Sequence, residues 1–132
     1  MSEPDFNWQK FVARIRAEGP LAKQLYVVFT QPTNGLSPVL ENMKAHLAYQ
    51  VQLEEQGIMF GAGPFADDDE QNWEGQGMVI IRTQSLADAK RIADADPMHK
   101  SGARSYRIRP WLLNEGSLTL KVSYSNGKRE II

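Results

Sequence analysis

The order of apolar patterns along the sequence predicts an α+β fold built on one antiparallel sheet. Four short runs are rich in β-branched and aromatic residues, which is typical of buried strands. Two longer stretches carry apolar residues three or four positions apart, which is typical of helices packed on a core. The 132 residues, of which 42% are hydrophobic and 23% charged, fit one domain and exclude a disordered, collagen-like or coiled-coil chain.

The predicted strands and helices follow one another in a definite order. The strands are expected at residues 25–30, 58–62, 78–82 and 104–111. The first long helix is expected from Val39 to its end at Gly57. A capping box at Ser85 opens the second, which runs to about Asp94 and cannot continue past Pro97. The resulting β-α-β-β-α-β order is the split βαβ, or ferredoxin-like, arrangement.

Two further elements are expected outside this core. An N-terminal amphipathic helix is predicted over residues 5–18 from the apolar stripe of Trp8, Phe11, Val12 and Ile15. Residues 118–132 are expected to form a C-terminal β-hairpin around Asn126-Gly127, a type I′ turn signal. We therefore expect a single domain over residues 1–132, with its core at about residues 25–111.

A sheet with helices on one face leaves its other face uncovered. Soluble proteins rarely tolerate a large exposed apolar surface. Pairing of two copies through the bare face is the usual remedy, so we expect a homodimer or a higher even oligomer.

Composition excludes several classes of function. The chain has no cysteine, which excludes disulfides, cysteine-ligated zinc, iron–sulfur clusters and thiol nucleophiles. Fifteen basic and sixteen acidic residues give a net charge of −1, so no overall field recruits nucleic acid. The longest apolar runs are far too short to cross a bilayer, and the first residues, Met1 to Asp5, do not resemble a signal peptide. We expect a cytoplasmic protein that binds neither membrane nor nucleic acid.

Three polar side chains of the first long helix are candidates for a binding site. His46 lies on the shoulder of the apolar stripe, Gln50 follows one turn later, and Tyr49 lies just beyond. This border between core and solvent is where the mouth of a pocket is expected. The alternative is a boundary histidine that is satisfied by a backbone carbonyl.

The end of the second helix supplies an acid and a second imidazole. Asp96 is expected to face the negative end of the helix dipole, where ionisation is disfavoured and the carboxyl can accept a proton or orient a protonated histidine. His99 lies near the same turn. The alternatives are a solvated acid before a helix stop and an exposed loop histidine.

Other candidates lie at the ends of the strands. Gly61-Ala62-Gly63-Pro64 lacks side-chain bulk, so a ligand or another backbone can approach there, although a tight turn explains it equally well. It does not match a phosphate-binding loop. The last core strand carries three cations, Arg104, Arg107 and Arg109, of which Arg107 and Arg109 share a face. They can meet an anionic ligand or pair with the acidic loop.

No metal site is expected from the sequence. The two histidines do not have the spacing of a metal-binding helix. The run Asp67-Asp68-Asp69 lacks the glycine and glutamate of a calcium loop.

Several short pieces together resemble the YciI-like (YCII-related) family over about residues 25–111. They are Leu25-Tyr26-Val27-Val28, Ala45-His46-Leu47, Gly61-Ala62-Gly63-Pro64, Ser85-Leu86 with Ala89, Ala93-Asp94-Ala95-Asp96-Pro97 and Ile108-Arg109-Pro110-Trp111. Met98-His99 departs from the family, which often has an aromatic residue after Asp-Pro. The N-terminal helix and the C-terminal hairpin are additions.

The resemblance implies a dimeric α+β barrel of ferredoxin-like protomers and a cofactor-free pocket with a paired histidine and aspartate. These map onto His46 and Asp96 as catalytic residues. The candidates for substrate binding are Tyr49, Gln50, Gly63, Pro64, His99 and Arg107.

Family members with a clear role act on small aromatic-derived rings. One of them converts 5-chloro-2-hydroxyhydroquinone to 2-hydroxy-1,4-benzoquinone by dehydrochlorination. We therefore expect a cofactor-independent proton-transfer enzyme, a lyase or isomerase, in which a neutral imidazole takes a proton from a ring hydroxyl. The alternatives are a non-catalytic dimer that binds a small ligand and a cofactor-free barrel monooxygenase.

Overall fold

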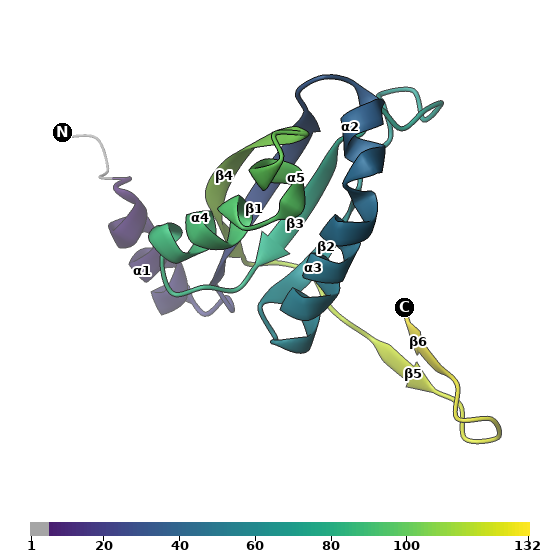
Figure 1. The fold of residues 1–132 in the computed structure, drawn as a ribbon. Helices are drawn as coiled ribbons and strands as arrows, with labels where there is room; N and C mark the ends of the chain where they lie inside the picture. Colours follow the sequence, from purple (N-terminus) through teal and green to yellow (C-terminus); the bar gives the residue numbers. More distant parts are fainter. Residues whose placement is uncertain (1–5) are drawn as a thin grey trace. The chain divides into compact units, whose positions relative to one another are not determined.

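The computed structural model describes residues 6–132, and its chain falls into two compact units (Figure 1). Gln24–Leu112 form the first, which we call the core unit. The first 23 residues together with Leu113–Ile132 form the second, the terminal unit. The N-terminal helix is predicted to begin at residue 5, and that residue lies outside the described residues.

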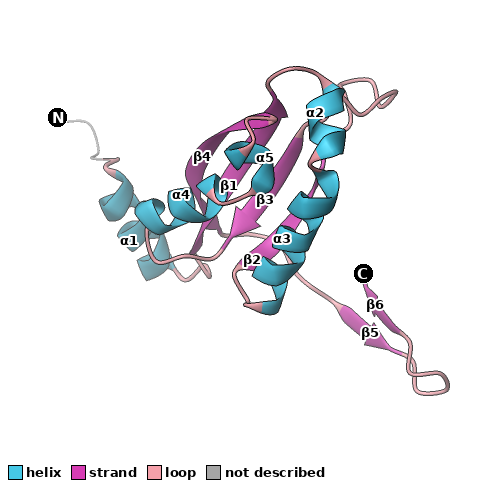
Figure 2. Cartoon of the chain, viewed as in Figure 1, coloured by secondary structure: helices cyan, strands magenta, loops and turns pink. Residues whose placement is uncertain are grey.

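The core unit is organised around one four-stranded sheet (Figure 2). Its strands lie side by side in the order β2-β3-β1-β4, and β3 is antiparallel to both of its neighbours. This confirms the predicted α+β fold with an antiparallel sheet. The bounds are Lys23–Pro32 for β1, Met59–Pro64 for β2, Gly77–Ile81 for β3 and Arg104–Leu113 for β4.

Helices cover one face of this sheet, as Figure 1 shows for α3, α4 and α5. The helices of the core unit are α2 (Leu36–Glu41), α3 (Met43–Glu55), α4 (Leu86–Asp94) and α5 (Pro97–Lys100). The single helix expected from Val39 to Gly57 is therefore wrong. Asn42, with φ −99° and ψ 2°, separates α2 from α3, and its side-chain amide donates to the Pro38 carbonyl. Such local hydrogen bonds compete with a continuous helix.

Alternation along the strands decides which side chains face the helices. Tyr26 and Val28 of β1 pack with Ile81 of β3 against Ala89 and Ala93, two small residues of α4. The intervening side chains of β1 point to the other face. Small residues on α4 allow the helix to approach the sheet closely, so this cluster anchors the segment that leads to Asp96.

The sequence between α4 and α5 contains the turn that positions the acid. Ser85 caps α4, because its hydroxyl accepts the Asp88 backbone N–H, and this confirms the predicted start of the helix at Ser85. Sequence reasoning anticipated only a helix stop at Pro97. The structure instead begins α5 there, with Pro97 in the first turn and Asp96 as its N-cap. α5 contacts both α3 and α4.

The opposite face of the sheet carries apolar side chains around a shallow hollow of about 300 Å³. Trp111, at 39% exposure, stands at its rim. The other lining residues are Val27, Phe29, Met78, Ile80, Arg109 and Pro110.

The terminal unit holds α1 (Trp8–Glu18) and a two-stranded sheet of β5 (Leu120–Val122) and β6 (Arg129–Ile131). The predicted type I′ turn is wrong, because only Gly127 of the pair Asn126-Gly127 has a positive φ. The Asn126 side chain accepts the Lys128 N–H, and the Ser123 N–H donates to the Lys128 carbonyl, which closes a longer loop. Among the described residues, no helix is both long and apolar enough to span a membrane.

Candidate active site

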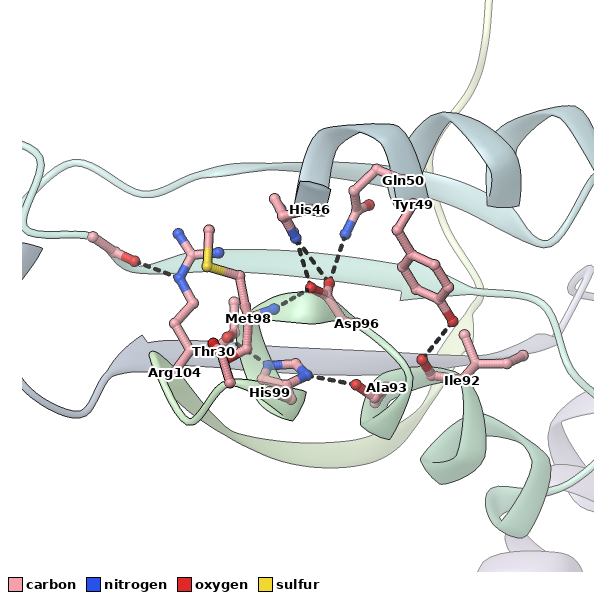
Figure 3. A network of polar contacts seen from close by, with 12 residues as sticks. Thr30, His46, Tyr49, Gln50, Ile92, Ala93, Asp96, Met98, His99 and Arg104 are labelled. Carbon is pink, nitrogen blue, oxygen red and sulfur yellow. Dashed lines mark hydrogen bonds and ion pairs between the residues drawn. The ribbon is translucent and has the colours of Figure 1, made fainter. Parts of the chain in front are cut away.

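His46 of α3 and Asp96, the N-cap of α5, form a buried pair, although they are 50 positions apart in sequence (Figure 3). The Nδ1 atom of His46 lies 2.9 Å from Oδ1 and 2.8 Å from Oδ2 of Asp96. The two residues are 8% and 4% exposed. Because an ionised carboxylate can only accept, we assign the imidazole proton to Nδ1. The Nε2 atom then keeps a free lone pair, and it has no hydrogen-bond partner among residues 6–132.

Asp96 is held as a carboxylate by several donors. The Met98 backbone N–H donates to Oδ1 at 2.8 Å, and the Gln50 amide donates to Oδ2 at 3.3 Å. Burial by itself raises the pKa of Asp96, but the hydrogen bond and charge of His46, the Met98 N–H and the charge of His99 hold it below its usual value. The expectation that ionisation is disfavoured here is therefore wrong. Asp96 begins a helix, where negative charge is favoured, rather than ending one.

His46 lies in the wall of a cavity of about 660 Å³. This volume is within the usual range for small-molecule sites. Most of the wall is apolar and comes from α3, β2 and β3, with the side chains of Leu47 and Val51 about half exposed. Polar or charged side chains enter the wall at few positions, namely Thr30, His46, Gln50, Glu54 and Arg104.

The end of β2 lines the same cavity through Gly61, Gly63 and Pro64. A Cβ added at either glycine meets no atom within 4 Å, so the missing side chains leave open space rather than a close backbone contact. Of the two explanations offered for these glycines, room for a ligand fits this geometry.

Arg104 and Thr30 also line the cavity. The sequence indicates Arg104 only as one of three cations of β4, and it does not indicate Thr30. Arg104 is 6% exposed, and its Nε donates to the Gly75 carbonyl at 3.0 Å. Burial lowers the pKa of Arg104, and the charge of Asp96 opposes that effect. Strand alternation is the signal that could have found both residues. Arg104 has the same parity in β4 as Tyr106, which packs against the helix-side core.

His99 is half-buried in α5 rather than exposed in a loop. Its Nδ1 lies 2.6 Å from the Ala93 carbonyl, and its Nε2 lies 2.9 Å from the Thr30 hydroxyl. The carbonyl can only accept, so Nδ1 carries the proton and Nε2 accepts from Thr30. With both nitrogens engaged and the ring 4.7 Å from that of Tyr106, His99 supports Thr30 and does not line the cavity.

Two other candidates also lie outside the cavity wall. The Tyr49 hydroxyl donates to the Ile92 carbonyl at 2.7 Å, and burial, with the charge of Asp96, raises the pKa of Tyr49. The Arg107 guanidinium lies 5.7 Å from the centre of the Phe29 ring, on the opposite face of the sheet. The structure thus brings His46, Asp96, Gln50, Gly63 and Pro64 together and leaves Tyr49, His99 and Arg107 apart.

The acidic loop does not form a metal site in the described part of the chain. No group of three or more histidine, aspartate or glutamate side chains gathers there in a way that could hold a metal ion. The Asp67 carboxylate instead accepts the backbone N–H groups of Gln71 and Asn72.

Comparison with known proteins adds the family to this geometry. Residues 24–112 match the YCII-related domain, and the chain belongs to the YCII-related family. The dyad, the cavity and Arg104 all fall within the matched residues.

A solved structure with a similar fold is 5-chloro-2-hydroxyhydroquinone dehydrochlorinase (TftG) from Burkholderia phenoliruptrix AC1100, in complex with 2,5-dihydroxybenzoquinone. The TM-score is 0.54 at 22% sequence identity, over 66% of this chain and 92% of that chain. The similarity concerns the fold. Among curated proteins, no sequence matches this chain.

Proposed function

We propose that this protein is a cofactor-independent proton-transfer enzyme, a lyase or isomerase, that acts on a small hydroxylated ring compound. One observation carries the proposal: the His46 imidazole is hydrogen-bonded to Asp96 through Nδ1, and its Nε2, at the wall of a cavity, has no partner among the described residues. A neutral imidazole with a free lone pair on Nε2 can act as a general base.

Asp96 orients the His46 imidazole and stabilises the positive charge that the imidazole acquires when it is protonated. The hydrogen bonds to both carboxylate oxygens fix the imidazole tautomer, so the lone pair stays on Nε2. When Nε2 takes a proton, the imidazolium forms directly beside a carboxylate whose pKa is already lowered. The Gln50 amide and the Met98 N–H hold that carboxylate in place.

The proposed reaction consists of proton transfers on the ring. His46 takes a proton from a ring hydroxyl, and the ring becomes a ketone as a proton is added at the carbon that carries the leaving group. Loss of a second hydroxyl proton then drives the leaving group out with its bonding electron pair. For a chlorinated hydroxyhydroquinone the products are a hydroxybenzoquinone, chloride and one proton, so no electrons are exchanged with a cofactor.

The comparisons support the class of ligand. The structural neighbour is named as a dehydrochlorinase of a hydroxylated ring, and its structure holds a dihydroxybenzoquinone. A mostly apolar cavity with a few polar groups suits such a ring. Dehydrochlorination is therefore the first reaction to test.

We further propose that the protein acts as a homodimer joined through the bare face of the sheet, as in a dimeric α+β barrel. The apolar hollow on that face, with Trp111 at its rim, supports this assignment.

The proposed activity is tested under nitrogen with 5-chloro-2-hydroxyhydroquinone, by following chloride release and quinone absorbance. The wild-type protein is expected to turn over, and His46→Ala is expected to lower the rate about 10²–10⁴-fold. An absolute need for oxygen would favour the monooxygenase alternative. Binding of ring compounds without any conversion would favour the non-catalytic alternative.

A further inference from the structure

Arg104 is a buried residue of the cavity wall, and most of its N–H donors form no hydrogen bond with the described residues. A guanidinium has five N–H donors. Among the described residues, the structure gives Arg104 one hydrogen bond, from Nε to the Gly75 carbonyl. The two terminal nitrogens, Nη1 and Nη2, have no hydrogen-bond partner in this part of the chain. Neither atom is among the buried side-chain atoms that lack a partner, so both are accessible from the cavity that Arg104 lines. A group with negatively charged oxygens is the ligand that accessible N–H donors of a guanidinium fit.

The carboxylates nearby do not meet these donors. Both oxygens of Asp96 already accept from His46, Gln50 and Met98, and Asp96 acts on Arg104 through space. Glu54, the carboxylate among the described lining residues, is exposed. In Figure 3 the dashed line from Arg104 runs to a backbone carbonyl, that of Gly75, and none joins it to His46 or Asp96.

A second, independent observation points to a ligand. The Oε1 atom of Gln50 is buried and has no hydrogen-bond partner. The amide cannot be turned around to relieve this, because the ionised Asp96 needs the Nε2 donor. Gln50 lines the cavity, so a small rotation of its amide would present Oε1 as an acceptor to a hydroxyl group of a bound molecule.

We propose that Arg104 forms an anion-binding subsite in this cavity and that the natural ligand is a ring compound with a negatively charged oxygen, in addition to a hydroxyl group that Gln50 accepts. The charged oxygen is either an ionised ring oxygen or a ring carboxylate. The inference rests on the proposed function only in taking a ring compound as the ligand.

Titration calorimetry with matched pairs of probes tests this. The first pair is 2,5-dihydroxybenzoate and its neutral amide. The second is 2,5-dihydroxybenzoquinone, which is ionised at neutral pH, and its neutral dimethyl ether. We expect the anion of at least one pair to bind about tenfold to a hundredfold more tightly than its neutral counterpart, as for a charged hydrogen bond. The pair that shows the preference tells a carboxylate from a ring oxyanion.

Variants identify the residue that is responsible. Arg104→Gln is expected to reduce the preference to about one, whereas Arg107→Gln, on the opposite face of the sheet, is expected to keep it. Arg104→Lys keeps the charge and should retain part of the preference, which covers the case in which Arg104→Gln does not fold. Equal affinities within both pairs, no binding of either anion, or an unchanged preference in folded Arg104→Gln would overturn the inference.

The same measurements separate this inference from the proposed function. His46→Ala should lose turnover and keep the anion preference. Turnover retained in His46→Ala contradicts the proposed base and leaves Arg104 as an anion site. A wild-type protein without the preference contradicts the Arg104 inference and leaves His46 as the base.

Discussion

Asp96 shows that a shift of one or two residues relative to a helix end decides whether a carboxylate is stabilised. At the end of α4 a carboxylate faces the negative end of a helix, whereas at the start of α5 it accepts a backbone N–H. The dipeptide Asp96-Pro97 is itself a signal for an N-cap followed by a first helical residue, so the sequence contained the information. His46 and Asp96 are 50 positions apart in sequence, so no local pattern predicts that they pair. Only the family resemblance implied the pair.

The lowered pKa of Asp96 predicts how acid affects stability. A carboxyl whose folded pKa lies below its ordinary value, 3.8, stabilises the fold above that value and loses this contribution as the pH falls through the folded pKa. We therefore expect wild type to be more stable than Asp96→Asn at pH 5 and the difference to shrink by pH 3. Urea unfolding at both values measures it. A difference that grows on acidification would contradict the lowered pKa.

His99 is predicted to matter for stability rather than for turnover. Its two ring nitrogens form hydrogen bonds with the Ala93 carbonyl and the Thr30 hydroxyl, and both of these residues are buried. We expect His99→Ala to lower the free energy of unfolding by about 1–3 kcal/mol, the cost of leaving buried groups unpaired, with most of the activity retained. Chemical denaturation and turnover are measured on the same sample. A stable His99→Ala protein without activity would place this imidazole in the chemistry.

The arginines of β4 mark where sequence reasoning about the site failed. Arg107, a candidate for substrate binding, shares a face of β4 with Arg109, and that face lies away from the cavity. Arg104 has the parity of Tyr106 and Ile108, which pack toward the helices. Periodicity assigns residues to faces, but it does not say which face holds the cavity, because that depends on how the helices pack.

At the scale of elements, the strands were predicted more closely than the long helix. Alternation and β-branched runs located all four core strands, whereas the break at Asn42 went unseen because the apolar spacing continues through it. The consequence is functional. In α3 the buried residues are His46 and Leu53, while Leu47 and Val51 are about half exposed, so the imidazole lies in the cavity wall instead of on the shoulder of a stripe.

The C-terminal hairpin is predicted to need a partner surface. Its hydrophobic side chains remain exposed, up to 99% for Tyr124, and a lone two-stranded hairpin is marginal in water. Removal of residues 118–132 is therefore expected to weaken dimerisation or to reduce solubility. Sedimentation of the truncated and full-length chains over a concentration series measures the change. Identical behaviour of the two would show that the hairpin has no such role.

At the scale of the whole molecule, the bare sheet face predicts association. Light scattering at micromolar concentration should give about twice 14.9 kDa, or a higher even multiple. Trp111→Glu places a charge at the rim of the apolar hollow and should shift the protein toward monomer, whereas Arg91→Glu on α4 should not. A stable wild-type monomer would contradict the dimeric barrel.

The central claim is that His46 and Asp96 act as one unit, and a double-mutant cycle on turnover tests it most directly. The values of kcat/KM are compared for wild type, His46→Ala, Asp96→Asn and the double variant, all first shown to be folded. We predict that His46→Ala loses about 10²–10⁴-fold, that Asp96→Asn is also impaired, and that the double variant loses little more than His46→Ala alone. Losses that multiply, or a folded His46→Ala protein with full activity, would contradict the account.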